Sequence, residues 1–273
     1  MSQLIRTSDA DLALLPKYDR IMVALFRTLT NERDMENLPD AMPFDQDDVR
    51  EAMAKAVHDG WIEKPVKNVP DIKYTYDARR NLPEECEQGG PWTWLQNGKG
   101  RYKLQRTCRR NIILLPDDLP FGTPPIESEI DQTPPFVASL LGNDEQAVFT
   151  RVRNCGLISK FLGFNAWAIQ GHHRTTVNYG QIEVDEVQAG IDGEKRSIVP
   201  ISGKGGQDKL SWSQALNLNT YGAEKPLVSG LRTRSIGLWR DNENTIWMVE
   251  FSPEVEIDKI EIVNVRRFRL LLE

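Results

Sequence analysis

The sequence predicts an α/β (α+β) protein with an N-terminal domain over residues 1–115 and a mixed-sheet domain, flanked by helices, over residues 136–273. The length of 273 residues is enough for two ordinary domains. Residues 116–135 contain six prolines. Because proline fixes φ and lacks a backbone donor, this stretch is expected to be an extended linker. On both sides of it, segments with helical spacing and segments with β alternation follow one another.

The N-terminal domain is expected to begin with two helices. The second of these can be capped by Asp45 and ended by Gly60. The expected elements, in order, are a helix over 18–29, a loop at Pro39 and Pro43, a helix over 45–59, a strand over 71–76, a loop over 77–99 and a strand over 101–115.

Two helices followed by Gly-Trp-Ile at 60–62 and by β-like segments resemble a winged-helix module. Such modules commonly read DNA by placing a helix in the major groove. Here the second helix is acidic at its start, DQDDVRE, and its potential toward phosphate is therefore poor. Two interpretations stay open: the domain contacts DNA through the basic strand at 101–110, or it serves as a packing or protein-contact domain.

The second domain is expected to begin with a helix and to contain a β-hairpin at its centre. Asn143 or Asp144 can cap the helix, and Gly163 can end it. The expected elements are a helix over 144–161, strands over 166–170 and 172–177, a hairpin over 180–204, a helix over 212–221, and strands over 230–239, 245–251 and 259–271.

The central hairpin gathers polar side chains at one end. Asp192-Gly193 is a strong signal for a two-residue turn, which would pair Asp185 with Pro200 and Glu183 with Ser202. Since side chains alternate with a period of two, one face carries Glu183, Asp185, Ser202 and Lys204. Two carboxylates beside a lysine can seat a divalent cation. They also fit a solvated sheet face with a cross-strand Glu–Lys pair.

Composition favours a cytoplasmic protein that does not enter the membrane. No run approaches the roughly 18 apolar residues of a membrane span, and the N-terminus lacks the apolar core of a secretory signal. Three widely spaced cysteines indicate a reducing compartment, with neither a disulfide framework nor a zinc site. The adjacent His172 and His173 are expected to point to opposite faces of a strand, and they do not predict a metal cluster.

The net charge of −6 does not itself indicate a nucleic-acid-binding protein, but the basic residues are clustered. Residues 101–110 hold five basic residues and no acid, and further arginines cluster at 232–240 and 266–269. These clusters either form a local basic surface or are ordinary sheet-face arginines. The candidate DNA-binding residues are Arg101, Lys103, Arg106, Arg109, Arg110, Arg174 and Lys209.

Several stretches of the second domain resemble the PD-(D/E)xK superfamily of restriction-endonuclease-like nucleases, and more narrowly one group of bacterial restriction endonucleases. They are DEQAVFTRVRNCGLISKFLG, HHRTTV, GQIEVDEVQAGID and IVPISGKGGQDKLSWSQ. The resemblance implies a restriction-endonuclease-like fold and a DNA endonuclease of the restriction, phage-defence type that depends on Mg²⁺ or Mn²⁺. In such enzymes two acids hold the metal, which polarises the phosphate and acidifies the attacking water.

The family pattern falls on individual residues of this chain. Its first acid falls on Asp185 and its basic residue on Lys204, which would position the water and offset developing charge. Gln214, on the following helix, matches a glutamine of related nucleases, and Glu145 stands where some members place an additional acid. The second acid is expected two residues before the lysine, and there this chain has Ser202.

Ser202 departs from the family pattern, because a serine hydroxyl is a weak, neutral ligand for Mg²⁺. The expected register places Glu183 opposite Ser202, and we therefore expect the Glu183 carboxylate to take the place of the missing acid. The expected metal ligands are Asp185, Glu183 and Glu145, and the expected catalytic residues are Asp185, Lys204, Ser202 and Gln214.

Three functions stay open at this point. The first is a metal-dependent endonuclease that hydrolyses phosphodiester bonds in double-stranded DNA, which Asp185, Lys204 and Gln214 together favour. The second is a catalytically weakened or inactive relative that acts as a DNA-binding or regulatory module, which Ser202 favours. The third is a transcription regulator built on the winged helix. For a restriction enzyme, we expect a homodimer on palindromic DNA and a cognate methyltransferase as partner.

Overall fold

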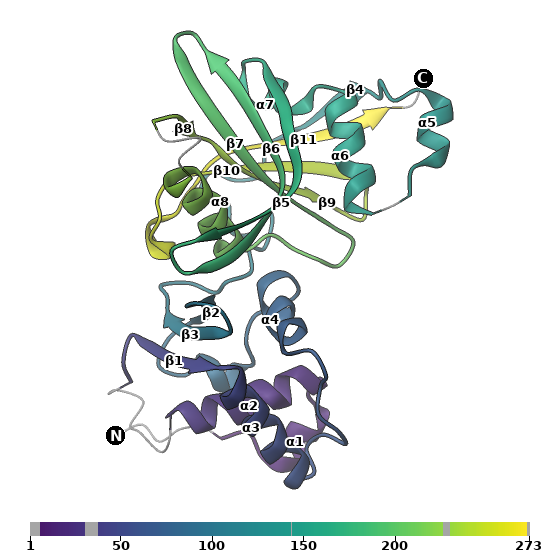
Figure 1. Cartoon of the computed structure of the whole chain (residues 1–273). Coiled ribbons are helices and arrows are strands. Elements are labelled where there is room, and N and C mark those ends of the chain that lie inside the picture. Colours follow the sequence, from purple (N-terminus) through teal and green to yellow (C-terminus); the bar gives the residue numbers. More distant parts are fainter. Residues whose placement is uncertain (1–5, 31–37, 143, 226–229, 272–273) are drawn as a thin grey trace. The chain divides into compact units, whose positions relative to one another are not determined.

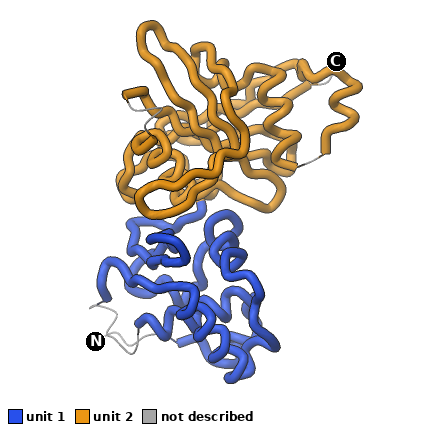
Figure 2. Tube along the Cα trace, in the orientation of Figure 1, with its two compact units in different colours: residues 1–112 blue, residues 113–273 orange. Residues whose placement is uncertain are grey.

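The computed structural model describes residues 6–30, 38–142, 144–225 and 230–271. The chain divides into two compact units, residues 1–112 and residues 113–273 (Figure 2). Each unit combines helices with a β-sheet, and the predicted α/β (α+β) class is confirmed (Figure 1). Within the described ranges, no helix has both the length and the apolar character needed to cross a bilayer.

Unit 1 combines helices with an antiparallel sheet of order β1-β3-β2. Its elements are α1 Asp9–Leu14, α2 Lys17–Thr30, β1 Ala41–Asp45, α3 Gln46–His58, α4 Val69–Ala78, a 3₁₀ helix Glu84–Glu87, β2 Trp92–Gln96 and β3 Arg101–Arg106. The two expected helices are confirmed as α2 and α3. Asp45 caps α3 through a reciprocal capping box with Asp48, and Gly60, at φ +74°, follows its end.

The strand expected at residues 71–76 is wrong, because these residues belong to helix α4. Ile72 and Tyr76, which favour strands by propensity, lie four residues apart and are both buried. Together with buried Val69 they form one apolar face at helical spacing. Pro70 stands in the first turn of the helix, where its missing N–H costs nothing.

Other expectations for unit 1 also fail in part. The segment 77–99, expected to be a loop, contains a 3₁₀ helix and β2, whose Trp92 and Trp94 are buried in the core. The strand expected after it ends early, at Arg106. The loop expected at Pro39 and Pro43 is partly strand β1, and β1 tolerates a proline because it lies at the edge of the sheet.

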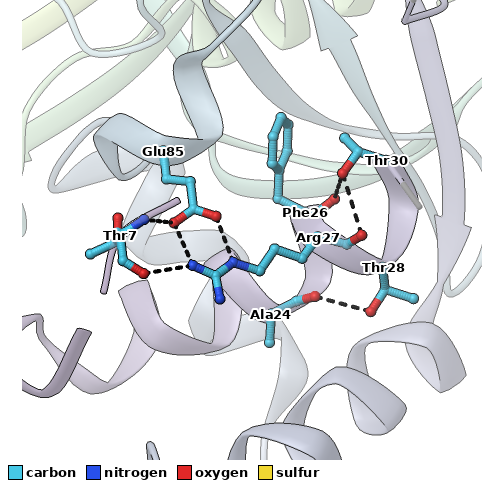
Figure 3. Close-up of polar contacts among 7 residues, drawn as sticks. All are labelled: Thr7, Ala24, Phe26, Arg27, Thr28, Thr30 and Glu85. Atoms are coloured by element: carbon cyan, nitrogen blue, oxygen red, sulfur yellow. Dashed lines mark hydrogen bonds and ion pairs between the residues drawn. The ribbon is translucent and has the colours of Figure 1, made fainter. Parts of the chain in front are cut away.

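A buried ion pair ties the N-terminal segment to α2 and the 3₁₀ helix of unit 1 (Figure 3). Arg27 donates from Nε and Nη2 to the two oxygens of Glu85 at 2.6 and 2.8 Å, and the Thr7 N–H donates to Glu85 at 2.8 Å. Burial raises the pKa of Glu85, but the hydrogen bonds from Arg27 and Thr7 outweigh it, and the net pKa is lowered. The carboxylate is therefore held in its charged form.

Unit 2 is built on a mixed sheet of order β4-β11-β10-β9-β7-β6-β5, with β8 paired to β7 off this path. The pairs β5–β6 and β6–β7 are antiparallel, whereas β7 and β9 are parallel. The elements are β4 Ile126–Ile130, α5 Pro135–Leu140, α6 Glu145–Asn154, α7 Leu157–Leu162, β5 Ala166–Val177, β6 Gly180–Asp192, β7 Lys195–Gly205, α8 Trp212–Glu224, β8 Arg232–Thr233, β9 Ser235–Arg240, β10 Thr245–Phe251, a 3₁₀ helix Ile257–Lys259 and β11 Ile262–Leu271.

Helices cover both faces of this sheet. Val199 and Ile201 of β7 lie in a buried cluster with residues of α6 and α7. Ile198, which the period of two places on the other face, lies in a cluster with Leu218 and Tyr221 of α8. The strand β7 is therefore buried on both sides, in keeping with its continuous run of apolar residues.

The single helix expected over 144–161 is two helices. α6 ends at Asn154, and Gly156, in the left-handed region at φ +58°, separates it from α7. Asp144 caps α6 by accepting from the Ala147 N–H at 2.9 Å. Asn143, the other expected cap, lies outside the described residues. Gly163, at φ +79°, ends α7 as expected.

The extended linker expected at 116–135 is also wrong, since this stretch lies in unit 2 and contains β4, which pairs in parallel with the end of β11. The strand expected over 230–239 is split into β8 and β9, and the last strand begins at Ile262, after a 3₁₀ helix. The two strands expected over 166–177 are one strand, β5. Helix α8 and strand β10 are confirmed.

Candidate active site

The turn between β6 and β7 lies one residue further along the chain than expected. Asp192 pairs with Lys195, which makes Gly193-Glu194 the two-residue turn. Gly193 has φ +60°. A positive φ at the first turn position is what a type II′ turn requires, and glycine meets it without strain. The sequence signal for a hairpin is therefore confirmed, but its register is two residues away from the expected one.

This register changes the partners of the candidate residues. The expected pairs of Asp185 with Pro200 and of Glu183 with Ser202 are wrong. Instead, Asp185 lies beside Ser202, whose Oγ donates to Asp185 Oδ2 at 3.0 Å. The Gly203 N–H donates to the same oxygen at 2.8 Å. Two donors from β7 thus fix the Asp185 carboxylate, and Ser202 acts on that carboxylate as a hydrogen-bond donor.

Lys204 and Glu145 meet next to Asp185. Lys204 Nζ lies 3.5 Å from Glu145 Oε1, and the side chain of Lys204 is only 7% exposed. Burial raises the pKa of Glu145; the charge of Lys204 opposes this shift, and the negative charge of Asp185 adds to it. Glu145 of α6 therefore lies close to Asp185 of β6 and Lys204 of β7, and the metal-binding and catalytic roles expected of these residues stay a prediction.

The glycine between Ser202 and Lys204 allows α6 to approach β7. A Cβ on Gly203 would lie 2.4 Å from Cε2 of the buried Phe149 on α6. Because glycine has no Cβ, the Phe149 ring packs directly on the strand. This contact brings the start of α6, and with it Glu145, to the end of β7 where Lys204 lies.

Glu183 takes part in a different group. Its carboxylate lies 3.6 Å from His172 Nδ1 and 3.2 Å from Arg174 Nε. One ligand atom from each of His172, Glu183 and Asp185 lies within 4.8 Å of the others. From the sequence alone, His172 is not expected to belong to a metal cluster. The signal that could have found it is its place on β5, the strand paired with the segment that carries Glu183 and Asp185.

Gln214 lies in the first turn of α8. Its backbone N–H donates to Oγ of the capping Ser211 at 3.4 Å. Its side-chain Oε1 is buried and has no hydrogen-bond partner among the described residues. The backbone hydrogen bond of Gln214 caps the start of α8. It does not join Gln214 to Asp185 or Glu145.

The candidate basic residues of unit 1 lie on β3 and in the segment that follows it, and they differ in exposure and in contacts. Arg101 is exposed and Lys103 half-buried, and they lie two residues apart on the outer face of the sheet. The guanidinium of Arg106 lies 5.1 Å from the centroid of the Trp92 ring, and its Nη2 donates to a backbone carbonyl. Arg110 pairs with Glu87 at 2.5 Å, and Arg109 is half-buried.

The two candidate DNA-binding residues of unit 2 are placed apart from each other. Arg174, on β5, pairs with Glu183, and its side chain is 70% exposed. Lys209, in the segment before α8, lines a cavity of about 220 Å³ together with Trp239, Asp117 and the segment 113–115. Of these two residues, Arg174 is therefore the one that the structure pairs with an acid of the hairpin.

Comparison of the chain with protein families, with curated proteins and with solved structures gives no match.

Proposed function

We propose that the chain is a metal-dependent DNA endonuclease of the restriction type, which hydrolyses phosphodiester bonds in double-stranded DNA at Glu145, Asp185 and Lys204. One observation carries this proposal. Two carboxylates and a nearly buried ammonium group, from three segments far apart in sequence, lie close enough to influence one another. A half-buried carboxyl group whose pKa is raised beside a second acid and a lysine is typical of a catalytic site.

The donor atoms fit a hard divalent cation. Mg²⁺ and Mn²⁺ prefer oxygen ligands such as the carboxylates of Asp185 and Glu145. When bound, such an ion supplies a Lewis acid for the phosphate and an acidified water. Burial and the charge of Asp185 raise the pKa of Glu145, and a bound cation would offset that cost. Lys204 supplies the fixed positive charge toward a phosphate that gains negative charge during reaction.

The arrangement of unit 2 supports the same proposal. A helical region, the antiparallel strands β5, β6 and β7, helix α8 and strand β9, which is parallel to β7, follow one another along the chain. This order agrees with the restriction-endonuclease-like fold that the sequence resembles. We propose that fold for unit 2.

Unit 1 has an order that supports a winged-helix role in DNA binding. Its elements include, in chain order, α2, β1, α3, α4, β2 and β3, and the three strands form a sheet of order β1-β3-β2. Helix α4, which follows α3, would then be the recognition helix, but on it Lys73 is paired with Asp77. We therefore propose that DNA is contacted through the β2–β3 hairpin, where Lys99 and Arg101 are exposed.

A second candidate function is favoured by Ser202. Its hydroxyl donates a hydrogen bond to Asp185, where the family pattern has a second acid that would bind metal. A chain with this arrangement could bind DNA without cutting it, as a regulatory or inactive relative of the nucleases. The two functions differ in one observable, which is metal-dependent cleavage.

Cleavage of unmethylated plasmid DNA with Mg²⁺ and with Mn²⁺ tests the proposal. Lys204→Ala and Asp185→Asn should lose cleavage, whereas Lys195→Ala, at the exposed far end of the same strand, should keep it. Cleavage by Ser202→Glu alone would favour the second function, with a site disarmed by the serine. DNA binding without cleavage by any variant would refute the endonuclease.

A further inference from the structure

A group of side chains able to bind a metal lies on β5 and β6 and shares Asp185 with the proposed active site. One ligand atom from each of His172, Glu183 and Asp185 lies within 4.8 Å of the other two. His172 Nδ1 is 3.6 Å from Glu183 Oε1, which is too long for a hydrogen bond. An imidazole nitrogen and two carboxylates thus face one another, and the imidazole and the Glu183 carboxylate are not bonded through these atoms.

The local backbone explains why His172 is part of this group. The β5–β6 ladder pairs Gly171 with Glu186 and His173 with Val184, and His172 between them has φ +44°. That conformation is uncommon for a residue with a Cβ. His173 lies edge-on against Tyr221 of α8, with ring centroids 5.6 Å apart. The two adjacent histidines therefore have different surroundings, and only His172 reaches the acids.

The distances are within reach of a bound ion. Donors bound at about 2.1 Å to one ion lie roughly 3.0–3.4 Å apart, so the three groups must close by up to about 1–2 Å. The side chains of His172 and Glu183 are 59% and 41% exposed and can rotate without disturbing the core. Asp185 is already fixed by Ser202 and Gly203, and it provides the anchor of the group.

The charges also match a divalent ion. A neutral imidazole and two carboxylates carry two negative charges together. Arg174 Nε lies 3.2 Å from Glu183 Oε2, while the other oxygen of that carboxylate, Oε1, is the one nearer His172. Because the Arg174 side chain is 70% exposed, its pair with Glu183 is worth little in water. It therefore does not prevent Glu183 from binding an ion.

Ligand chemistry determines which ion this group selects. Imidazole suits Fe²⁺, Ni²⁺, Cu²⁺ or Zn²⁺, and the two carboxylates also suit Mn²⁺, whereas Mg²⁺ prefers an all-oxygen site and retains its waters. We infer that His172, Glu183 and Asp185 bind a divalent transition-metal ion, with His172 as a ligand that replaces the acid missing at Ser202. The metal site stands on these contacts alone, and its use in DNA cleavage rests on the proposed function.

Mn²⁺ binding to the full chain tests this inference, measured by the loss of the electron paramagnetic resonance signal of the free ion, with Mg²⁺ as competitor. The informative variants are His172→Gln and Glu183→Gln, which remove one ligand from each strand at exposed positions. The matched control is His58→Gln, since His58 is an exposed histidine beside a single acid, Asp59. Circular dichroism checks that each variant folds.

We expect Mn²⁺ to bind and to resist a large excess of Mg²⁺. His172→Gln and Glu183→Gln should each weaken Mn²⁺ binding by about tenfold or more, and His58→Gln should leave it unchanged. Absence of Mn²⁺ binding by the wild-type chain, or binding that survives both substitutions, would overturn the inference.

Cleavage measured on the same proteins separates this inference from the proposed function. If cleavage is metal-dependent but His172→Gln changes neither Mn²⁺ binding nor the preference for Mn²⁺, the inference fails and the nuclease stands. If His172→Gln abolishes Mn²⁺ binding and the wild-type chain cuts no DNA, the metal site stands and the proposed function fails.

Discussion

Replacing Gly203 by alanine should destabilise unit 2 through a single contact. The added Cβ would lie 2.4 Å from Cε2 and 2.8 Å from Cζ of Phe149, where ordinary contact begins at 3.4 Å. The ring must therefore move by about 1 Å. Phe149 is only 2% exposed and belongs to the cluster of α6, α7 and the sheet, so it has no free space. Overpacking of this kind costs about 1–3 kcal/mol in free energy of unfolding.

The matched control for this substitution is two residues away on the same strand. A Cβ on Gly205 would meet Glu145 Cγ at 4.0 Å, which is an ordinary contact. Gly205→Ala should therefore range from neutral to a gain of about 1 kcal/mol, because alanine restricts the unfolded chain. Combining Gly203→Ala with Phe149→Leu should restore part of the loss, with a coupling energy of about 0.5–3 kcal/mol.

Urea unfolding of the full chain, followed by hydrogen exchange in peptides of α6 and β7, measures these free energies separately from unit 1. The slope of the free energy of unfolding against urea concentration should be the same for all variants, which would show that only stability has changed. If Gly203→Ala and Gly205→Ala differ by less than about 0.5 kcal/mol, the contact with Phe149 does not govern this position. The same conclusion follows if Phe149→Leu leaves the cost of Gly203→Ala unaltered.

Two further predictions concern carboxyl groups whose pKa values are shifted in the folded state. Glu85→Gln should destabilise unit 1 by about 3–5 kcal/mol, because it leaves the largely buried Arg27 without its counter-charge. Asp47→Asn, in the exposed pair with Arg50, should cost less than about 1 kcal/mol. Since the pKa of Glu85 is lowered, the stability from this pair should be present above pH 4.5 and lost as the pH falls through the folded-state pKa. Equal losses of stability for Glu85→Gln and Asp47→Asn in urea unfolding would contradict the expected difference between the two pairs. The pKa of Glu145 is raised by burial, so the Glu145 carboxyl group keeps its proton to a higher pH in the folded state than in the unfolded state. Wild-type stability should therefore fall as the pH rises through the folded-state pKa of Glu145. Glu145→Gln should therefore be more stable than wild type at neutral pH and similar to it in acid, and a less stable variant at pH 7 would refute the raised pKa.

The sequence predicts the elements that carry their own local signals. α2 and α3 have amphipathic spacing, and α3 also has its cap at Asp45 and its stop at Gly60. β10 is bounded by a turn and consists largely of apolar and β-branched residues, and it occurs where expected. These features depend on residues within a few positions of one another, and local spacing is sufficient to locate them.

The elements that sequence analysis missed depend on distant partners. β4 lies between prolines and looks like a linker, but it pairs with β11 more than 130 residues away. β2 follows two glycines and a proline, and its Trp92 and Trp94 form a strand because they are buried against Phe26 and Phe44. Local propensity cannot report such contacts, since they are set by tertiary packing.

Within the candidate site, some residues can likewise be placed from local sequence signals, whereas others depend on distant partners. The expected register of the central hairpin differs from the observed one by two residues. Because side chains alternate with a period of two, this error leaves Asp185 and Ser202 on the same face, where the sequence predicts them. The expected pairing of Glu183 with Ser202 depended on the register and is wrong, whereas the role of Glu183 as a metal ligand stays a prediction. His172 was missed because its surroundings follow from a left-handed φ of +44° within a strand, which alternation does not anticipate. Residues whose function depends only on the face of a strand can be found from sequence, whereas those that depend on a particular pairing or backbone angle require the structure.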